Sequence, residues 1–537
     1  MDGAAKPANL QDLRTHLANL ERAGKLVRVS REINKDTELM PLVRWQFRGL
    51  DESQRRGFLF ENVVDVKGRR YESGVAVGIY AGSSDIYSIG MGCQVGDIRK
   101  RWQAALAKPL PPVIVESGTV QEEVHMGDSL LEHGGIDEFP IPLSTPGFDV
   151  APYTTASNWV TKDPDTGWIN VGNYRGQAKS QDRMGMYIGA RKDAWKHWDA
   201  ARRQGKPYIE AALVVGGPAG LTYLSGSRVP FGVEEYAAAG ALIGQPLELV
   251  RCKTVDLVVP AHAELVIEGR ILTDYLEPEA PFGEFTGYMG ERVFNAVFEM
   301  TAVTHRKNPI FTAIISQMPP SESSKLKKLS QDNNYLFFLR NHCGIPQVTD
   351  ISFHEIALES WSVVQLKRCN PAVAWQTLYA IAGRNTSVGK TVIAVDEDID
   401  INDLDSVVWA LSYRMQPERD IVILGNRAIG LDPSGLPPRD GTRDMSVQAE
   451  FGSGALINAM RKWDYPPVSL PAKEYMEKAK AIWEELGLPK LTPRVPWHGY
   501  ELGNWSDRDR QEAEWAVKGE HHRTGDRAKQ QRRRADE

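Results

Sequence analysis

Three glutamates lie within one short stretch of the chain that two prolines prevent from being helical. The stretch runs from Leu276 to Gly290 and contains three carboxylates, Glu277, Glu279 and Glu284. Pro278 and Pro281 lack a backbone N–H, and each disfavours the helical region for the residue before it. The segment is therefore expected to be extended and turned.

The same stretch also supplies aromatic side chains. Phe282, Phe285 and Tyr288 provide apolar surface that could dehydrate a neighbouring carboxyl. A carboxyl in such surroundings can hold a proton near neutral pH and act as a general acid, and two carboxylates in unequal surroundings can divide such roles. An acidic surface loop would have a similar composition, so the rest of the chain must decide between the two interpretations.

An earlier segment has polar residues on one predicted face. In Trp168–Gln177 the apolar residues alternate with Asn170, Asn173 and Arg175, which is typical of a strand with one polar face. An asparagine oxygen can bind a hard cation, and an arginine can hold a carboxylate or phosphate through two parallel hydrogen bonds. An amphipathic strand with a solvated face would show the same alternation.

A short alanine-rich helix is predicted for Val233–Gly244. Glu234 and Glu235 lie in its first turn, where negative charge offsets the helix dipole. After this helix, residues 247–272 predict two apolar strands broken at Pro260 and Gly269, which lead into the glutamate stretch.

Taken in order, these motifs resemble the UbiD-like decarboxylases that use prenylated FMN, and the resemblance covers about residues 10–490. In that family an N-x-x-x-x-R strand and a P-E-x-P-F-G-E loop bear an arginine and two glutamates. The resemblance implies Arg175, Glu279 and Glu284 as catalytic residues, with Arg175 and Glu279 paired beside the flavin. Glu284 would supply the proton that replaces CO₂.

The resemblance also implies a set of cofactor contacts. Removal of CO₂ from an sp² carbon needs an electron sink that side chains do not provide, and prenylated FMN supplies it in this family. Asn170, Glu235 and a divalent ion (Mn²⁺, Mg²⁺ or Fe²⁺) are expected to anchor the cofactor phosphate, with K⁺ as a further ion. The expected cofactor-binding residues are Asn170, Asn173, Tyr174, Arg175, Ser225, Ser227, Glu235 and Lys390.

One position departs from the family pattern. A histidine usually completes the metal site, but the corresponding segment here places Lys192 or Asp193 at that point. Asp193 is preferred because it preserves the interval to Gly205-Lys206-Pro207, and a carboxylate is a natural ligand for Mg²⁺ or Mn²⁺, whereas Lys192 could meet the phosphate directly. His197 is a third option and is expected on an exposed helix face.

Composition excludes several classes of protein. The chain has 537 residues, a net charge of −6, 42% hydrophobic and 25% charged residues, which is ordinary for a globular protein and favours neither nucleic-acid nor membrane binding. It has no apolar run approaching the ~20 residues that span a bilayer, and its start lacks the apolar core of a signal peptide, so a cytoplasmic location is expected. Four dispersed cysteines indicate neither a disulfide framework nor a cysteine zinc site.

Periodicity and turn signals predict an α/β multidomain fold. Leu10, Leu13, Leu17 and Leu20 have helical spacing, and a proline-rich break follows at 109–113. Strands alternate with helices beyond residue 320, which predicts a parallel sheet covered on both faces. The expected parts are an N-terminal α/β domain (1–113), a β-rich domain that the resemblance identifies as a split-barrel-like flavin domain (114–320), a C-terminal α/β oligomerisation domain (321–490) and a charged tail (491–537).

The function that these predictions favour is reversible non-oxidative decarboxylation. The substrate would be an aromatic or α,β-unsaturated carboxylic acid, or its CoA thioester, and Tyr174 beside Arg175 favours an aromatic one. A flavin-dependent oxidoreductase using the same pocket is the alternative, and consumption of NAD(P)H would distinguish it. The resemblance further implies a flavin prenyltransferase as cofactor supplier and a homo-oligomer, either a dimer or a hexamer.

Overall fold

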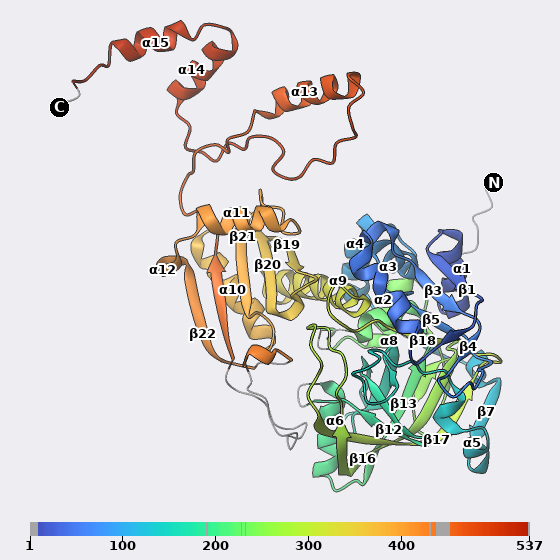
Figure 1. The fold of residues 1–537 in the computed structure, drawn as a ribbon. Coiled ribbons are helices and arrows are strands. Elements are labelled where there is room, and N and C mark those ends of the chain that lie inside the picture. Colours follow the sequence, from blue (N-terminus) through green and yellow to red (C-terminus); the bar gives the residue numbers. More distant parts are fainter. Residues whose placement is uncertain are drawn as a thin grey trace, which may run out of the picture.

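The structure is a computed structural model that describes residues 9–189, 192–226, 228–230, 232–428, 431–435 and 452–534. An N-terminal α/β region and a large central sheet lie together, and a second sheet is joined to them through one long helix (Figure 1). That helix, α9 (Glu322–Phe337), begins with a capping box in which Ser321 and Ser324 satisfy each other's backbone N–H groups.

The N-terminal region is built on a four-stranded sheet in the order β1-β3-β5-β18. Its strands are β1 (Leu26–Val29), β3 (Gly57–Phe60), β5 (Val75–Val77) and β18 (Phe311–Ala313). The predicted leucine helix is confirmed as α1 (Leu13–Arg22), and it buries Leu13, Leu17 and Leu20. Helices α2 (Leu39–Gly49), α3 (Ser84–Met91) and α4 (Ile98–Ala107) complete this part.

A nine-stranded antiparallel sheet forms the central part. Eight strands follow the order β10-β9-β13-β16-β17-β12-β11-β8, and β7 pairs with β17 outside that path. Their bounds are β7 (Glu123–Met126), β8 (Tyr153–Thr154), β9 (Ser157–Lys162), β10 (Ile169–Asn173), β11 (Gly176–Ser180), β12 (Arg183–Met186), β13 (Tyr208–Val215), β16 (Leu265–Glu279) and β17 (Val293–His305).

Two details of this sheet differ from the predictions. The predicted strand Trp168–Gln177 is two strands, because the chain leaves β10 after Asn173 and re-enters the sheet as β11 at Gly176. Gly269 does not break a strand, because β16 continues through it with a shift of register against β17. The predicted break at Pro260 is confirmed, since β15 (Val258–Pro260) ends there.

Three helices lie beside the central sheet. Helix α6 (Asp193–Arg203) packs on β13 and β16, and α7 (Ala219–Ser225) packs against α8 (Glu235–Ile243). The predicted alanine-rich helix is thereby confirmed as α8. Its small residues allow it to be buried along almost its whole length, and it starts at Glu235.

The C-terminal sheet is mixed, so the prediction of a parallel sheet is wrong in part. Its order is β19-β20-β21-β23-β22; β20, β21 and β23 are parallel, and the two edge strands are antiparallel. Its strands are β19 (Val348–Phe353), β20 (Trp361–Leu366), β21 (Thr391–Asp396), β22 (Ile421–Arg427) and β23 (Gly452–Asn458). Helix α10 (Pro371–Arg384) provides the crossover from β20 to the parallel strand β21, and α11 (Leu404–Arg414) carries the chain from β21 toward β22.

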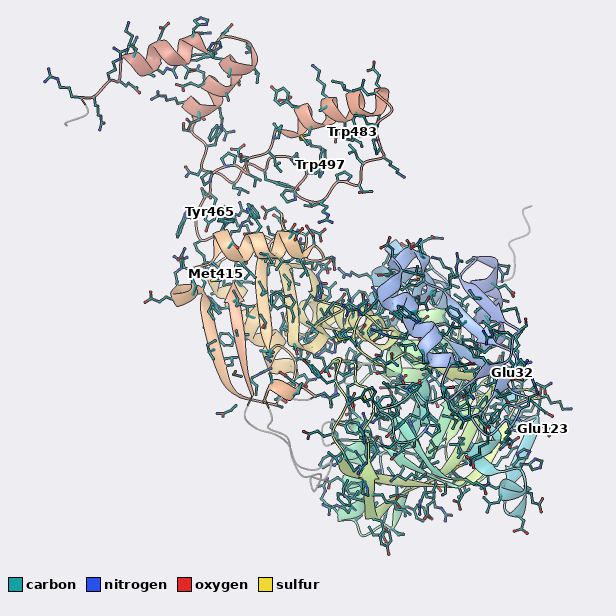
Figure 2. The ribbon with its side chains drawn as sticks, in the orientation of Figure 1. Glu32, Glu123, Met415, Tyr465, Trp483 and Trp497 are labelled. Carbon is teal, nitrogen blue, oxygen red and sulfur yellow. The ribbon has the colours of Figure 1, made fainter. Side chains whose placement is uncertain are left out.

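The chain ends in an extended arm. Helices α13 (Lys473–Glu485), α14 (Asp507–Val517) and α15 (His522–Lys529) contain no buried residue. Figure 1 shows this segment reaching away from the two sheets, and Figure 2 labels Trp483 and Trp497 along it. None of the helices in the described part of the chain combines the length and apolar character that a membrane crossing requires.

Candidate active site

A cavity of about 600 Å³ lies where the central and C-terminal parts meet. Its wall includes Arg175 and Glu284 from the central part and the loop around residues 383–388 at the end of α10. The volume lies within the roughly 300–1,000 Å³ that is usual for small-molecule and cofactor sites.

Arg175 joins two glutamates that are about one hundred residues away in the sequence. Its Nε and Nη2 donate to Glu279 Oε1 and Oε2 at 2.7 and 2.8 Å, and its Nη1 donates to Glu284 Oε1. The side chains of Arg175, Glu279 and Glu284 are 8%, 0% and 10% exposed. Burial lowers the pKa of Arg175, but the two carboxylates outweigh this effect, so its pKa lies well above the ordinary value.

The two glutamates differ in their access to the cavity. Glu284 is one of its lining residues, whereas Glu279 is not among the described residues that line it. Glu279 therefore lies on the side of Arg175 that faces away from the cavity, and it holds the guanidinium through two parallel hydrogen bonds. Glu284 lies on the cavity side, where it accepts a hydrogen bond from Nη1.

Aromatic rings enclose the arginine. The Arg175 guanidinium carbon lies 4.3 Å from the ring centre of Tyr187 and 5.1 Å from that of Phe282. Tyr153 packs on Phe282 with ring centres 4.5 Å apart, and burial followed by the charge of Glu279 raises the pKa of Tyr153. These contacts keep water away from one side of the ion pairs.

Backbone hydrogen bonds hold the glutamate stretch in a tight turn. The N–H groups of Glu284 and Gly290 donate to the carbonyls of Tyr288 and Phe282 at 2.9 and 2.8 Å. Gly287, with φ of +94°, closes the turn by donating to the Glu284 carbonyl. A Cβ on Gly290 would lie 2.9 Å from Glu284 Oε1, so the absence of a side chain there leaves room for the Glu284 carboxyl. The prediction of an extended and turned segment is confirmed.

A second group of oxygen atoms lines another side of the cavity. Asn170 on β10, Glu235 at the start of α8 and Asp193 at the start of α6 all reach its wall. Burial raises the pKa of Glu235 to about 8, and the charge of Asp193 adds to the rise. The Glu235 carboxylate accepts from the Val171 N–H at 3.4 Å, and Asn170 Nδ2 donates to the Tyr174 hydroxyl at 3.4 Å.

Two family models match the chain in succession. Residues 113–319 match the 3-octaprenyl-4-hydroxybenzoate carboxy-lyase Rift-related domain, and residues 328–459 match the C-terminal domain of the same enzyme family. An uncharacterized protein of Aquifex aeolicus is 32% identical over 389 residues, which cover 70% of this chain and 75% of the relative. The chain belongs to the UbiD family.

Similar solved structures extend this result to nearly the whole chain. Vanillic acid decarboxylase of Sedimentibacter hydroxybenzoicus in its closed form superposes with a TM-score of 0.77 at 26% identity, covering 88% of this chain and 99% of that one. An evolved dimeric form of the UbiD-class enzyme HmfF from Pelotomaculum thermopropionicum, in complex with prFMN, gives 0.73 at 29%, covering 88% and 100%. The protein is thus a member of the UbiD-like carboxy-lyase family.

The position that departs from the UbiD family pattern faces the cavity. Asp193 and Lys192 are both lining residues, and the Asp193 carboxylate bonds to Lys196 at 2.7 Å and lies 3.7 Å from Arg228. The prediction that His197 is exposed is wrong. Its ring is buried on the sheet side of α6, where Nδ1 lies 3.0 Å from the Thr161 hydroxyl and burial lowers its pKa.

The remaining predicted cofactor residues fall in three places. Asn173, Tyr174 and Ser225 line the cavity, and the Ser225 hydroxyl donates to Asn158 at 2.6 Å. Lys390 is not among the described lining residues; its ammonium group binds Asp432 and Ser434 at 2.7 Å beside a smaller cavity. Ser227 lies outside the residues that the structure describes.

Sequence reasoning missed two residues of the site. Tyr187 directly follows β12, and its ring lies against Arg175. Asp149 accepts a hydrogen bond from the Thr145 N–H at 2.6 Å. Burial raises the pKa of Asp149 to about 6, although backbone hydrogen bonds, including one from Gly283, act to lower it. Neither residue belongs to a spacing pattern, because each comes from a different segment that packs on the glutamate turn.

Proposed function

We propose that the protein is a prenylated-FMN-dependent decarboxylase with Arg175, Glu279 and Glu284 as its catalytic residues. The observation that supports this most strongly is that Arg175 contacts both Glu279 and Glu284, from two separated segments, and that Arg175 and Glu284 line one cavity. Family membership supports the reaction class, because the similar solved structures include a decarboxylase and an enzyme in complex with prFMN.

The proposed role of Glu284 follows from its competition with the substrate. A substrate carboxylate that reaches Arg175 competes with Glu284 for Nη1 and leaves the fully buried Glu279 in place. Once released from the arginine, Glu284 is available on the open side of the cavity to carry the transferred proton. It can then give the proton that takes the place of CO₂ on the substrate carbon, and it regains a proton from solvent.

Glu279 is proposed to act by holding Arg175. Its two hydrogen bonds fix the plane of the guanidinium, and its burial keeps it from exchanging with the substrate. Arg175 thereby keeps one directional donor toward the cavity, which places the substrate carboxylate at a defined position beside Glu284.

The cavity suits a flavin phosphate with its ion. When bound, prenylated FMN supplies the electron sink that decarboxylation at an unsaturated carbon needs. Asn170, Asp193 and Glu235 offer hard oxygen donors, which suit Mg²⁺ or Mn²⁺. The mutual repulsion of Asp193 and Glu235 supports this assignment, because a cation between two carboxylates relieves it. Asn173, Tyr174 and Ser225 are proposed as further cofactor contacts, with Lys192 near the phosphate.

An aromatic acid or its CoA thioester is the proposed substrate. Phe282, Phe285, Ile314 and Leu326 give the cavity apolar walls beside the Arg175 guanidinium. Such a wall accommodates a flat ring while the arginine takes the carboxylate. We also propose that the cofactor comes from a flavin prenyltransferase and that the protein is a homo-oligomer, which light scattering of the purified protein would test.

The test is the Glu284→Gln variant of the protein reconstituted with prenylated FMN. We expect normal flavin absorbance and loss of CO₂ release in a screen of aromatic acids and thioesters, whereas Glu291→Gln, at an exposed position of the same turn, should behave like the wild type. Decarboxylation at the wild-type rate by Glu284→Gln would refute the assignment, and NAD(P)H oxidation by the wild type would favour an oxidoreductase.

A further inference from the structure

Two histidines and a glutamate meet at the far edge of the central sheet. His125 lies on β7, His305 ends β17, and Glu138 ends a 3₁₀ turn (Gly135–Glu138). None of the three is among the described residues that line the 600 Å³ cavity. Figure 2 labels Glu123, also on β7, at the right-hand surface of the molecule.

Strand pairing brings the two imidazoles to one face. Val303 lies opposite His125 in the antiparallel ladder of β17 and β7, so His305 is the diagonal neighbour of His125 on the same side. Glu138 reaches between them: its Oε2 lies 3.1 Å from His125 Nδ1, and its Oε1 lies 3.4 Å from His305 Nε2. One ligand atom from each residue lies within 4.8 Å of the other two.

The backbone fixes the position of one hydrogen on the His305 ring. Nδ1 lies 2.7 Å from the backbone carbonyl of Arg306, which can only accept, so Nδ1 carries the hydrogen. Nε2 is buried and has no hydrogen-bond partner among the described residues, although a carboxylate oxygen faces it. A buried ring nitrogen facing a carboxylate oxygen calls for a cation between them, either a proton or a metal ion.

We propose that His125, Glu138 and His305 bind one divalent transition-metal ion, with Zn²⁺ as the best fit. Two imidazoles and a carboxylate are a common zinc donor set, and bonds of about 2.0–2.1 Å in tetrahedral geometry separate ligand atoms by roughly 3.4 Å. Each histidine nitrogen lies close to that spacing from one oxygen of Glu138, at 3.1 Å from Oε2 for His125 and 3.4 Å from Oε1 for His305, and a small rotation of the carboxylate would present one oxygen to both. The hydrogen bond from Nδ1 of His305 to a carbonyl is the usual second interaction of a metal-binding histidine.

The proposed ion would be a structural link with one open position. Glu138 is 23% exposed, so water can reach the fourth position from that side. The ion would tie β7 and the 3₁₀ turn to the end of β17, which pairs with β16 in the middle of the sheet. The exposed His133 ring stacks on that of His125, with ring centres 3.8 Å apart.

The test is the zinc content of the full-length, tag-free protein after dialysis against Zn²⁺, measured by elemental mass spectrometry. The wild type should hold one more zinc per chain than His305→Gln, and Glu138→Gln should show the same loss. His262→Gln is the matched control, because His262 and Glu248 form a His–Glu pair 2.8 Å apart that no third ligand joins among the residues that the structure describes. Glu235→Gln should keep the zinc that His305→Gln loses, which separates this ion from one in the large cavity.

Co²⁺ provides a second measurement. The visible absorption of four-coordinate Co²⁺ should appear in the wild type and in His262→Gln and be absent from Glu138→Gln. Circular dichroism establishes that each variant is folded, and if His305→Gln does not fold, Glu138→Gln decides the outcome. An equal zinc content per chain in the wild type and in folded Glu138→Gln would overturn the proposal. The contact between His305 and Glu138 would then be held by a shared proton and not by a metal ion.

Discussion

Replacing Glu235 by glutamine should make the flavin-free protein more stable at high pH. Glu235, at the start of α8, is only 9% exposed to solvent. Burial raises the pKa of Glu235 from 4.5 to about 8, and the negative charge of Asp193 contributes to the rise. At higher pH the folded protein without a bound ion must hold a negative charge in surroundings that disfavour it.

The sign and size of the effect follow from that pKa. Between pH 4.5 and about 8 the folded state keeps a proton that the unfolded chain has released, so the free energy of unfolding falls as pH rises. The difference between the two pKa values corresponds to roughly 5 kcal/mol once the pH exceeds 8. Glutamine does not titrate and can still accept the Val171 N–H, so Glu235→Gln should match the wild type at pH 5 and exceed it at pH 9.

The assay is urea unfolding at pH 5 and pH 9, followed by tryptophan fluorescence, of protein freed of flavin and treated with EDTA. Glu234→Gln is the matched control, because Glu234 is the exposed neighbour in the same turn and should give no pH-dependent gain. Added Mn²⁺ should stabilise the wild type and leave Glu235→Gln unchanged. A stability difference between variant and wild type that is the same at both pH values would refute the reasoning.

Three further predictions concern other parts of the structure. Asn170→Ala should purify without the yellow flavin absorbance that the wild type shows after reconstitution, and an Ala variant that keeps full flavin content would contradict the proposed phosphate site. Gly290→Ala places a Cβ 2.9 Å from Glu284 Oε1, so kcat should fall about tenfold or more with flavin content unchanged; an unaltered kcat would show that the turn relaxes freely. Arg414→Met leaves the buried Asp398 without its cation and Asp396 with Arg461 alone, 3.5 Å away, and should cost about 3–5 kcal/mol in urea unfolding. Arg419→Met, at a pair that is 48% exposed on the arginine side, should cost much less.

Much of the active-site neighbourhood could be predicted because its residues lie in short motifs. The P-E-x-P-F-G-E stretch contains two of the three charges, and its prolines determine that it is not helical. The spacing of Asn170 and Arg175 predicted a continuous strand, but the chain leaves the sheet at residues 174–175. Alternation of polar and apolar residues does not reveal such a break, because residues on both sides of it keep the same period.

Other features depend on packing between distant segments. His197 was expected on an exposed helix face, yet it is buried on the face of α6 that packs against the sheet. Each antiparallel pair in the C-terminal sheet joins strands that are consecutive among the described elements, β19 with β20 and β22 with β23. A sequence pattern of alternating strands and helices predicts the parallel strands at the centre of the sheet, but it does not determine the direction of the strands at the edges.

The terminal arm has a consequence for how this protein should melt. Helices α13, α14 and α15 have 13, 11 and 8 residues and bury no side chain, and isolated helices shorter than roughly 12–15 residues are only marginally stable in water. Their ellipticity should therefore decline gradually on warming, as a sloping baseline ahead of the cooperative transition. A trace of protease should trim the chain from its carboxyl end while both sheets stay intact.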